Sequence, residues 1–179
     1  MAGESVERPQ HVIVMGVSGC GKSTVGAILS TRLGWPFEEG DRHHLPASIA
    51  KMSAGIPLED SDRWPWLETL AGVLRSHEAE GRSSLLACSA LKRAYRDLLR
   101  TGAPRVRFLH LHGAREVLQA RLDTRKGHFF PPDLLASQYA TLEPLEPDED
   151  GIVVDVALPP EAQVEAALRW LGRAAAEPA

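Results

Sequence analysis

The chain has 179 residues, 44% of them hydrophobic and 25% charged, and this ordinary globular composition predicts a single folded domain over residues 1–179. Its net charge of −4 disfavours nucleic-acid binding by phosphate neutralisation, and its apolar runs are too short to span a bilayer. Residues 1–10 lack the apolar core of a signal peptide, and two cysteines build no disulfide framework, so we expect a soluble cytoplasmic protein.

Short apolar segments alternate with longer segments of helical periodicity along the chain. Strands are predicted at 11–15, 35–38, 84–88, 105–111 and 151–157. Helices are predicted at 22–33, 46–54, 64–80, 91–100, 114–125 and 161–171. This alternation favours a doubly wound α/β fold, in which helices cover both faces of a five-stranded parallel sheet.

Two segments interrupt the alternation. Residues 41–81 contain two predicted helices and no strand, and residues 126–150 are rich in proline, aromatic and acidic residues. Insertions at strand ends often carry binding elements and lids. We interpret 41–81 as a substrate-binding insertion and 126–150 as a lid region, whose acidic run 143–150 we expect to be solvated.

The strongest motif is Gly16-Val-Ser-Gly-Cys-Gly-Lys-Ser, which fits the phosphate-loop pattern and lies between a predicted strand and a predicted helix. Glycines let backbone N–H groups surround phosphates at a helix N-terminus, where Lys22 bridges the outer phosphates and the Ser23 hydroxyl ligates Mg²⁺. The motif predicts a site for ATP or GTP. Its predicted members are Gly16, Ser18, Gly19, Cys20, Gly21, Lys22, Ser23 and Thr24.

Two acidic residues, Glu39 and Asp41, follow the second predicted strand. The third strand ends without the metal-binding Asp of many ATPases and GTPases, and no Asn-Lys-x-Asp guanine motif occurs. Period-two spacing places both carboxylates on one side, facing the phosphate loop. One interpretation is that one carboxylate binds Mg²⁺ while the other receives a substrate hydroxyl proton. The alternative is that both are solvated loop acids.

Longer strings carry a family signature. The phosphate loop is followed by Glu39-Gly-Asp-Arg-His-His, by Lys51-Met-Ser-Ala-Gly-Ile-Pro-Leu and by Asp60-Ser-Asp-Arg-Trp-Pro-Trp-Leu. More specific still are Cys88-Ser-Ala-Leu-Lys-Arg-Ala-Tyr-Arg-Asp-Leu-Leu-Arg and Arg121-Leu-Asp-Thr-Arg-Lys-Gly-His-Phe-Phe. Over residues 11–156 the chain resembles the gluconokinases, P-loop sugar-acid kinases related in fold to shikimate and nucleoside monophosphate kinases. Glu39 departs from the pattern, since an Asp is common there.

The resemblance implies transfer of the γ-phosphoryl group of ATP to the 6-hydroxyl of D-gluconate by a cytoplasmic homodimer. It implies that Arg121 stacks on adenine and that Arg125 approaches the transferring phosphoryl group. We predict Lys22, Asp41 and Arg125 as catalytic residues. Ser23 and Glu39 are the predicted metal ligands.

The predicted substrate contacts are Asp41, His44, Arg63, Lys92 and His128. Several have an ordinary alternative: His44 as a surface residue, Arg63 as the partner of Asp60 or Asp62, and Lys92 as a solvated helix residue. The roles of His43 and Gln138 stay open.

Two other functions compete with this interpretation. One is a kinase for another small molecule, such as shikimate or a different aldonate, although the absence of a Gly-Gly run after the third strand disfavours shikimate. The other is a regulatory nucleotide-binding protein that hydrolyses ATP poorly.

Overall fold

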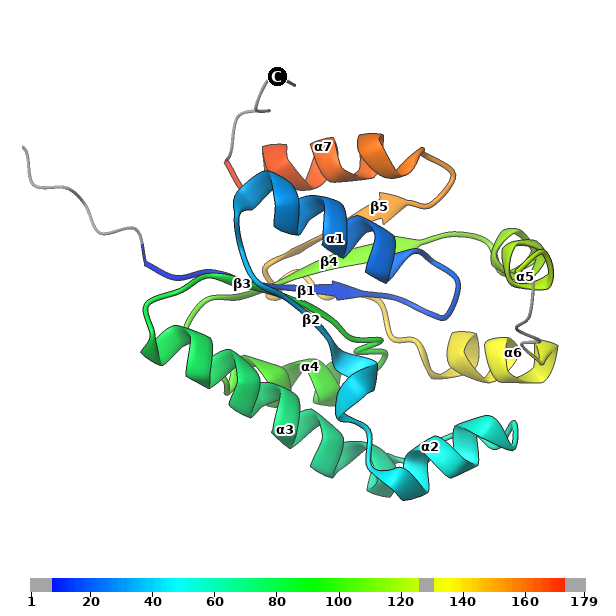
Figure 1. Cartoon of the computed structure of the whole chain (residues 1–179). Coiled ribbons are helices and arrows are strands. Elements are labelled where there is room, and N and C mark those ends of the chain that lie inside the picture. Colours follow the sequence, from blue (N-terminus) through cyan, green and yellow to red (C-terminus); the bar gives the residue numbers. More distant parts are fainter. Residues whose placement is uncertain (1–7, 126–130, 173–179) are drawn as a thin grey trace, which may run out of the picture.

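A computed structural model describes residues 8–125 and 131–172. Within them, five strands form one parallel sheet in the order β2-β3-β1-β4-β5 (Figure 1), which confirms the predicted sheet. The strands are β1 (His11–Met15), β2 (Phe37–Glu39), β3 (Ser84–Ala87), β4 (Val106–His112) and β5 (Gly151–Asp155). The helices are α1 (Lys22–Leu33), the 3-10 helix η1 (Gly40–His43), α2 (Pro46–Ser53), α3 (Asp60–Ala79), α4 (Arg93–Arg100), α5 (Arg115–Asp123), α6 (Pro132–Thr141) and α7 (Pro160–Trp170).

Helices cover both faces of the sheet: α1 and α7 lie on one face and α3 and α4 on the other (Figure 1). Successive side chains of a strand point to opposite faces, so β1 contributes to both cores. Val12 and Val14 pack in the core that contains α1 and α7, whereas Ile13 and Met15 pack in the core that contains α3 and α4. Burial on both faces explains the nearly continuous apolar run at 11–15.

The carboxyl ends of the strands share one edge of the sheet. At this edge β1 continues into the phosphate loop and β2 into η1, while α2, α5 and α6 lie around it (Figure 1). Ligands of parallel α/β sheets bind at this edge. No helix in the described ranges is both long and apolar enough to cross a membrane.

Helix α3 begins at Asp60, four residues before the start that the sequence suggested. The pair Trp64-Pro65 resembles a helix start because proline is favoured in the first turn. A capping box begins the helix earlier instead, since the Asp62 carboxylate accepts the Glu59 N–H at 2.9 Å and the Glu59 side chain accepts the Asp62 N–H. Pro65 consequently lies inside the helix.

The expectation that the acidic run 143–150 is solvated is wrong for Glu149. Its carboxylate and the Arg96 guanidinium are both fully buried and lie 2.6 Å apart (Oε1 to Nε). Arg93 also binds Asp148 from the same face of α4. The segment between α6 and β5 is therefore fastened to α4 by charged contacts.

Candidate active site

The phosphate loop connects the end of β1 to the start of α1. Gly16 has a φ of +140°, and a Cβ there would lie 2.5 Å from the Leu111 carbonyl oxygen, so only glycine fits. Gly21, the N-cap of α1, has a φ of 98°. The first turn of α1 presents unpaired N–H groups and the positive end of the helix dipole, which is the arrangement that binds phosphate.

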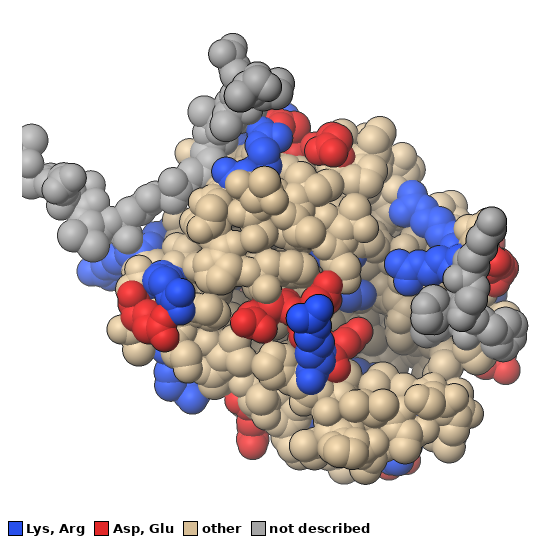
Figure 2. All heavy atoms as spheres, viewed as in Figure 1, with Lys and Arg blue, Asp and Glu red and all other residues tan. Residues whose placement is uncertain are grey.

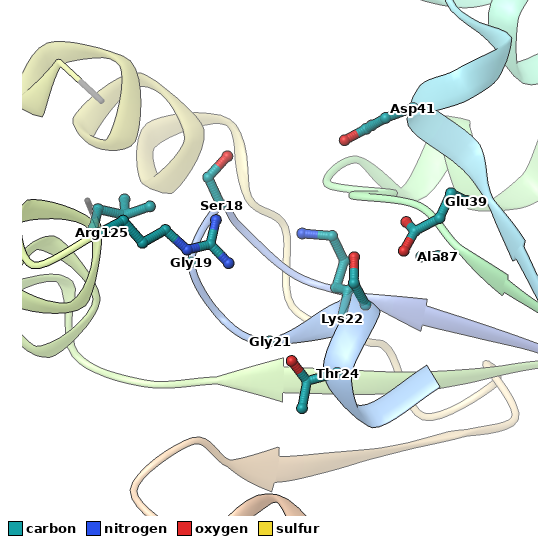
Figure 3. A pocket seen from close by; sticks show the side chains of 11 residues that line it. Ser18, Gly19, Gly21, Lys22, Thr24, Glu39, Asp41, Ala87 and Arg125 are labelled. Carbon is teal, nitrogen blue, oxygen red and sulfur yellow. The ribbon is translucent and has the colours of Figure 1, made fainter. Parts of the chain in front are cut away.

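A cavity of about 200 Å³ opens over this loop (Figure 3). Glu39 and Asp41 lie on one side of the loop and Arg125 on the other. The lining consists of Ser18, Gly19, Gly21, Lys22, Ser23, Thr24, Glu39, Asp41, Ala87, Leu122 and Arg125. The structure thus brings most of the predicted nucleotide, metal and catalytic residues together.

Lys22 lines the cavity whereas Cys20 is buried beneath it, with Lys22 Nζ 3.8 Å from Cys20 Sγ. The Lys22 ammonium donates to the carbonyl oxygens of Gly16 and Val17 at 3.0 and 3.1 Å, on the cavity side. The Cys20 side chain is buried in the core that contains α1. Gly16 and Cys20 are the two predicted phosphate-loop residues that do not line the cavity, and both shape the loop beneath it.

Ser23 and Glu39 fit a magnesium site that relies on phosphate and water for most of its ligands. Both line the cavity, and a hydroxyl and a carboxylate are the hard oxygen donors that Mg²⁺ prefers. The described residues contain no cluster of three or more His, Cys, Asp or Glu that could hold a metal ion alone. The donor set therefore suits a cation that arrives with a nucleotide.

A second cavity of about 260 Å³ shares Ser18, Lys22 and Asp41 with the first. It lies between the insertion and α6. The rest of its lining is His44, Met52, Ile56, Pro57, Leu58, Arg63, Ser89, Pro131, Leu134, Ser137, Gln138 and Thr141. A molecule in the second cavity would meet a phosphoryl donor in the first at the three shared residues.

Asp41 lies where the cavities meet, with a side chain that is 81% exposed. His44 Nε2 lies 3.6 Å from Asp41 Oδ1, and the His44 ring stacks on buried Trp66 with centroids 4.1 Å apart. The contact with His44 lowers the pKa of Asp41, partial desolvation opposes this, and the charge of Lys22 lowers the pKa further. The carboxylate is thus ionised at neutral pH and suited to orient a hydroxyl.

Two further side chains, those of Trp66 and His43, lie at η1 and line neither cavity. Trp66 is buried and donates its indole N–H to the Gly40 carbonyl at 2.8 Å, so its role is to hold η1 in place. His43 lines neither cavity, and its Nε2 lies 3.6 Å from a Glu38 carboxylate oxygen. Of the two histidines, only His44 faces the second cavity.

Arg63 presents a cation to the second cavity. The carboxylates that were its alternative partners bind lysines instead: Asp60 accepts from Lys92 at 2.9 Å and Asp62 from Lys51 at 2.8 Å. Across the described ranges, no ion pair joins Arg63 to a carboxylate. Lys92 lines neither cavity, so the structure does not bring this predicted contact to the substrate.

Two further predictions concern the segment that begins with α5. Arg121 donates to the Val156 carbonyl at 2.5 Å and lines neither cavity. Arg125, just after α5, points toward the phosphate loop (Figure 3). His128 lies outside the described residues.

Sequence reasoning missed the wall that α6 contributes. Leu134, Ser137 and Thr141 line the second cavity at spacings that put them on one face of the helix. They belong to no motif, and only packing shows their place. Met52 and Ile56, on the opposite wall, lie within one of the strings that carry the family resemblance.

Comparison with known proteins shows which family this chain belongs to. The shikimate kinase family model matches residues 18–132. A gluconokinase of Gluconobacter oxydans is 46% identical over 162 residues, which cover 90% of this chain and 91% of the relative. The chain belongs to the gluconokinase family. Membership confirms the resemblance inferred from the sequence strings.

Solved structures agree with this membership. The crystal structure of a gluconokinase from Sinorhizobium meliloti is 46% identical with a TM-score of 0.85, covering 94% of this chain and 95% of that one. An unliganded sugar kinase from Janibacter is 53% identical with a TM-score of 0.89, covering 93% and 96%. Each match covers more than nine-tenths of this chain.

Proposed function

We propose that this enzyme transfers the γ-phosphoryl group of ATP to the 6-hydroxyl of D-gluconate, giving ADP and 6-phospho-D-gluconate. The observation that carries the proposal is the meeting of two cavities at Ser18, Lys22 and Asp41. One is built on a phosphate loop, and the other contains the guanidinium of Arg63. Membership of the gluconokinase family supports the choice of acceptor.

The donor side works by positioning and charge. Backbone N–H groups at the start of α1 bind the phosphates, with Lys22 beside them and Arg125 across the cavity. Ser23 and Glu39 would hold Mg²⁺, which supplies charge neutralisation at the phosphates when bound. We also propose Arg121 for the adenine ring.

The acceptor side selects a sugar acid. Asp41 orients the 6-hydroxyl toward the donor and receives its proton as the bond to phosphorus forms. Arg63 binds the acceptor carboxylate, and His44 contacts the polyol. Lys92 acts indirectly, because it neutralises Asp60 and leaves Arg63 for the substrate. His128 remains a predicted substrate contact.

A panel of acceptors tests the function. ADP release and sugar phosphate are measured together for gluconate, glucitol, glucose, shikimate and a second aldonate. Gluconate should give the highest kcat/KM, with one sugar phosphate formed per ADP. Preference for another acid would favour the rival kinase, whereas slow ADP release with no acceptor dependence would favour the regulatory protein.

We further propose Mg²⁺ dependence, a cytoplasmic location and a homodimer, as the family resemblance implies. Chelation with EDTA should abolish phosphoryl transfer, and added Mg²⁺ should restore it. Light scattering of the purified protein should give twice the mass of the chain; a monomer at assay concentration would contradict the dimer.

A further inference from the structure

A glutamine on α6 binds both the backbone N–H and the hydroxyl of one phosphate-loop residue. Gln138 Oε1 accepts the backbone N–H of Ser18 at 2.7 Å, and Gln138 Nε2 donates to the Ser18 hydroxyl at 3.0 Å. The backbone N–H must donate, so the orientation of the amide is fixed by its partner. The two positions are 120 apart in the sequence, so this contact is made by the tertiary fold alone.

Ser18 is one of the three residues that line both cavities. In Figure 3 its hydroxyl points away from the loop, toward α6. The face of α6 that carries Gln138 also carries Leu134, Ser137 and Thr141, which line the acceptor cavity. The two hydrogen bonds therefore fix the distance between the acceptor wall and the donor loop.

Other contacts hold α6 elsewhere along its length. Leu135 is fully buried in the core that contains α1, and the Tyr139 hydroxyl donates to the Gly113 carbonyl at 2.7 Å. Both anchor the helix to the protein, but neither is part of the acceptor-cavity lining. Gln138 alone among these three joins α6 to the loop that faces both substrates.

We propose that Gln138 is a positioning residue that sets the acceptor cavity in register with the phosphate loop, so that the sugar-acid hydroxyl meets the γ-phosphoryl group. The inference rests on the proposed function and names a residue for it. Gln138 acts through Ser18 and through the α6 wall. Its loss therefore displaces the acceptor, while the backbone of residues 19–24 still binds the nucleotide.

The test compares Gln138→Leu, which removes both hydrogen bonds at similar volume, with Ser18→Ala, which removes only the bond to the hydroxyl. Displacement of a substrate by about 1 Å costs on the order of a hundredfold in rate. In Gln138→Leu we expect kcat/KM for gluconate to fall about ten- to a hundredfold, and in Ser18→Ala by a smaller factor. The dissociation constant of ADP should change less than about threefold in both.

A further readout separates positioning from simple loss of fold. With the acceptor displaced, water competes for the phosphoryl group, so sugar phosphate formed per ADP released should fall below the wild-type ratio in Gln138→Leu. The matched control is Gln119→Leu on α5, where the amide donates to Asp123 at 2.8 Å outside both cavities. Its kinetics should equal those of the wild type.

Different outcomes would overturn the proposed function and the role of Gln138. A wild-type enzyme that does not phosphorylate gluconate would overturn the proposed function. Wild-type activity with unchanged gluconate kinetics in Gln138→Leu, or with equal losses of ADP and gluconate binding, would overturn the role of Gln138. If Gln138→Leu does not fold, Ser18→Ala decides: selective loss on gluconate supports the role, and unchanged kinetics overturn it.

Discussion

Replacing Arg96 with methionine tests how the segment between α6 and β5 is held. The Arg96 side chain is fully buried, and its Nε and Nη2 donate to the two Glu149 carboxylate oxygens at 2.6 and 3.0 Å. Its terminal nitrogens also donate to four backbone carbonyls, those of Ala90, Leu91, Glu143 and Pro144. One guanidinium therefore ties the loop after β3 to the segment after α6.

The expected loss of unfolding free energy in Arg96→Met follows from the groups that the substitution leaves unpaired. Methionine fills much of the space but leaves the Glu149 carboxylate buried, with the Glu146 N–H at 2.9 Å as its remaining hydrogen bond among the described residues. Breaking a buried ion pair by removing one partner costs about 3–5 kcal/mol of unfolding free energy. For a chain of this length, that corresponds to a fall in Tm of roughly 6–20 °C.

Urea unfolding followed by circular dichroism measures the effect. The control is Arg93→Met on the same helix, because Arg93 pairs with the exposed carboxylates of Asp97, Glu146 and Asp148 and its loss should destabilise the protein much less. The double variant Arg96→Met/Glu149→Leu should recover part of the loss, since no buried charge remains unpaired. A loss below about 1 kcal/mol in Arg96→Met, or no recovery in the double variant, would refute the reasoning.

Four more outcomes can be measured. Lys22→Ala should abolish phosphoryl transfer while the thermal melt stays near that of the wild type, because the ammonium faces a cavity and not the core. Asp41→Asn should lower kcat about 10²–10⁴-fold and change the ADP dissociation constant little; an unchanged kcat would point to Glu39 or to hydroxyl positioning alone. Arg63→Met should reduce the preference for gluconate over glucitol about tenfold or more, as side-by-side kinetics would show, and a preserved preference would place the carboxylate elsewhere. Burial, with the charges of His112, Arg96 and Lys22, lowers the pKa of His110 to about 4 from 6.5, so the unfolded chain binds more protons below pH 6.5. Stability should therefore fall as the pH drops from 6.5 toward 4, and His110→Phe should flatten that slope in urea melts.

The sequence predicted those parts of the site that depend on short local motifs. A phosphate loop needs its glycines, Lys22 and Ser23 at fixed spacing, so the requirement is visible without a structure. Glu39 and Asp41 both line the cavity as expected, but strand alternation is not the reason, because β2 ends at Glu39 and Asp41 lies in the 3-10 helix η1. The sheet followed from the same kind of local pattern.

Contacts between distant segments were not visible in this way. Lys92 lies near the expected sheet edge, yet Asp60, 32 residues away, takes its ammonium. The acidic run at 143–150 has the composition of a solvated loop, and only the packing of α4 shows that Glu149 is buried. Gln138 likewise shows its role only when α6 is placed against the phosphate loop.

The place of each strand in the sheet gives the two sides of the site different local stability. β1, which carries the phosphate loop, lies in the middle with a neighbour on either side, whereas β2 is an edge strand that pairs only with β3, over three residues. Edge segments open more readily than central strands, and hydrogen exchange measures the difference. Amides of β1 should exchange at the rate of global unfolding and those around Asp41 much sooner. ATP would then bind to a phosphate loop that is already rigid, and binding of the sugar acid would order β2 and the residues around Asp41.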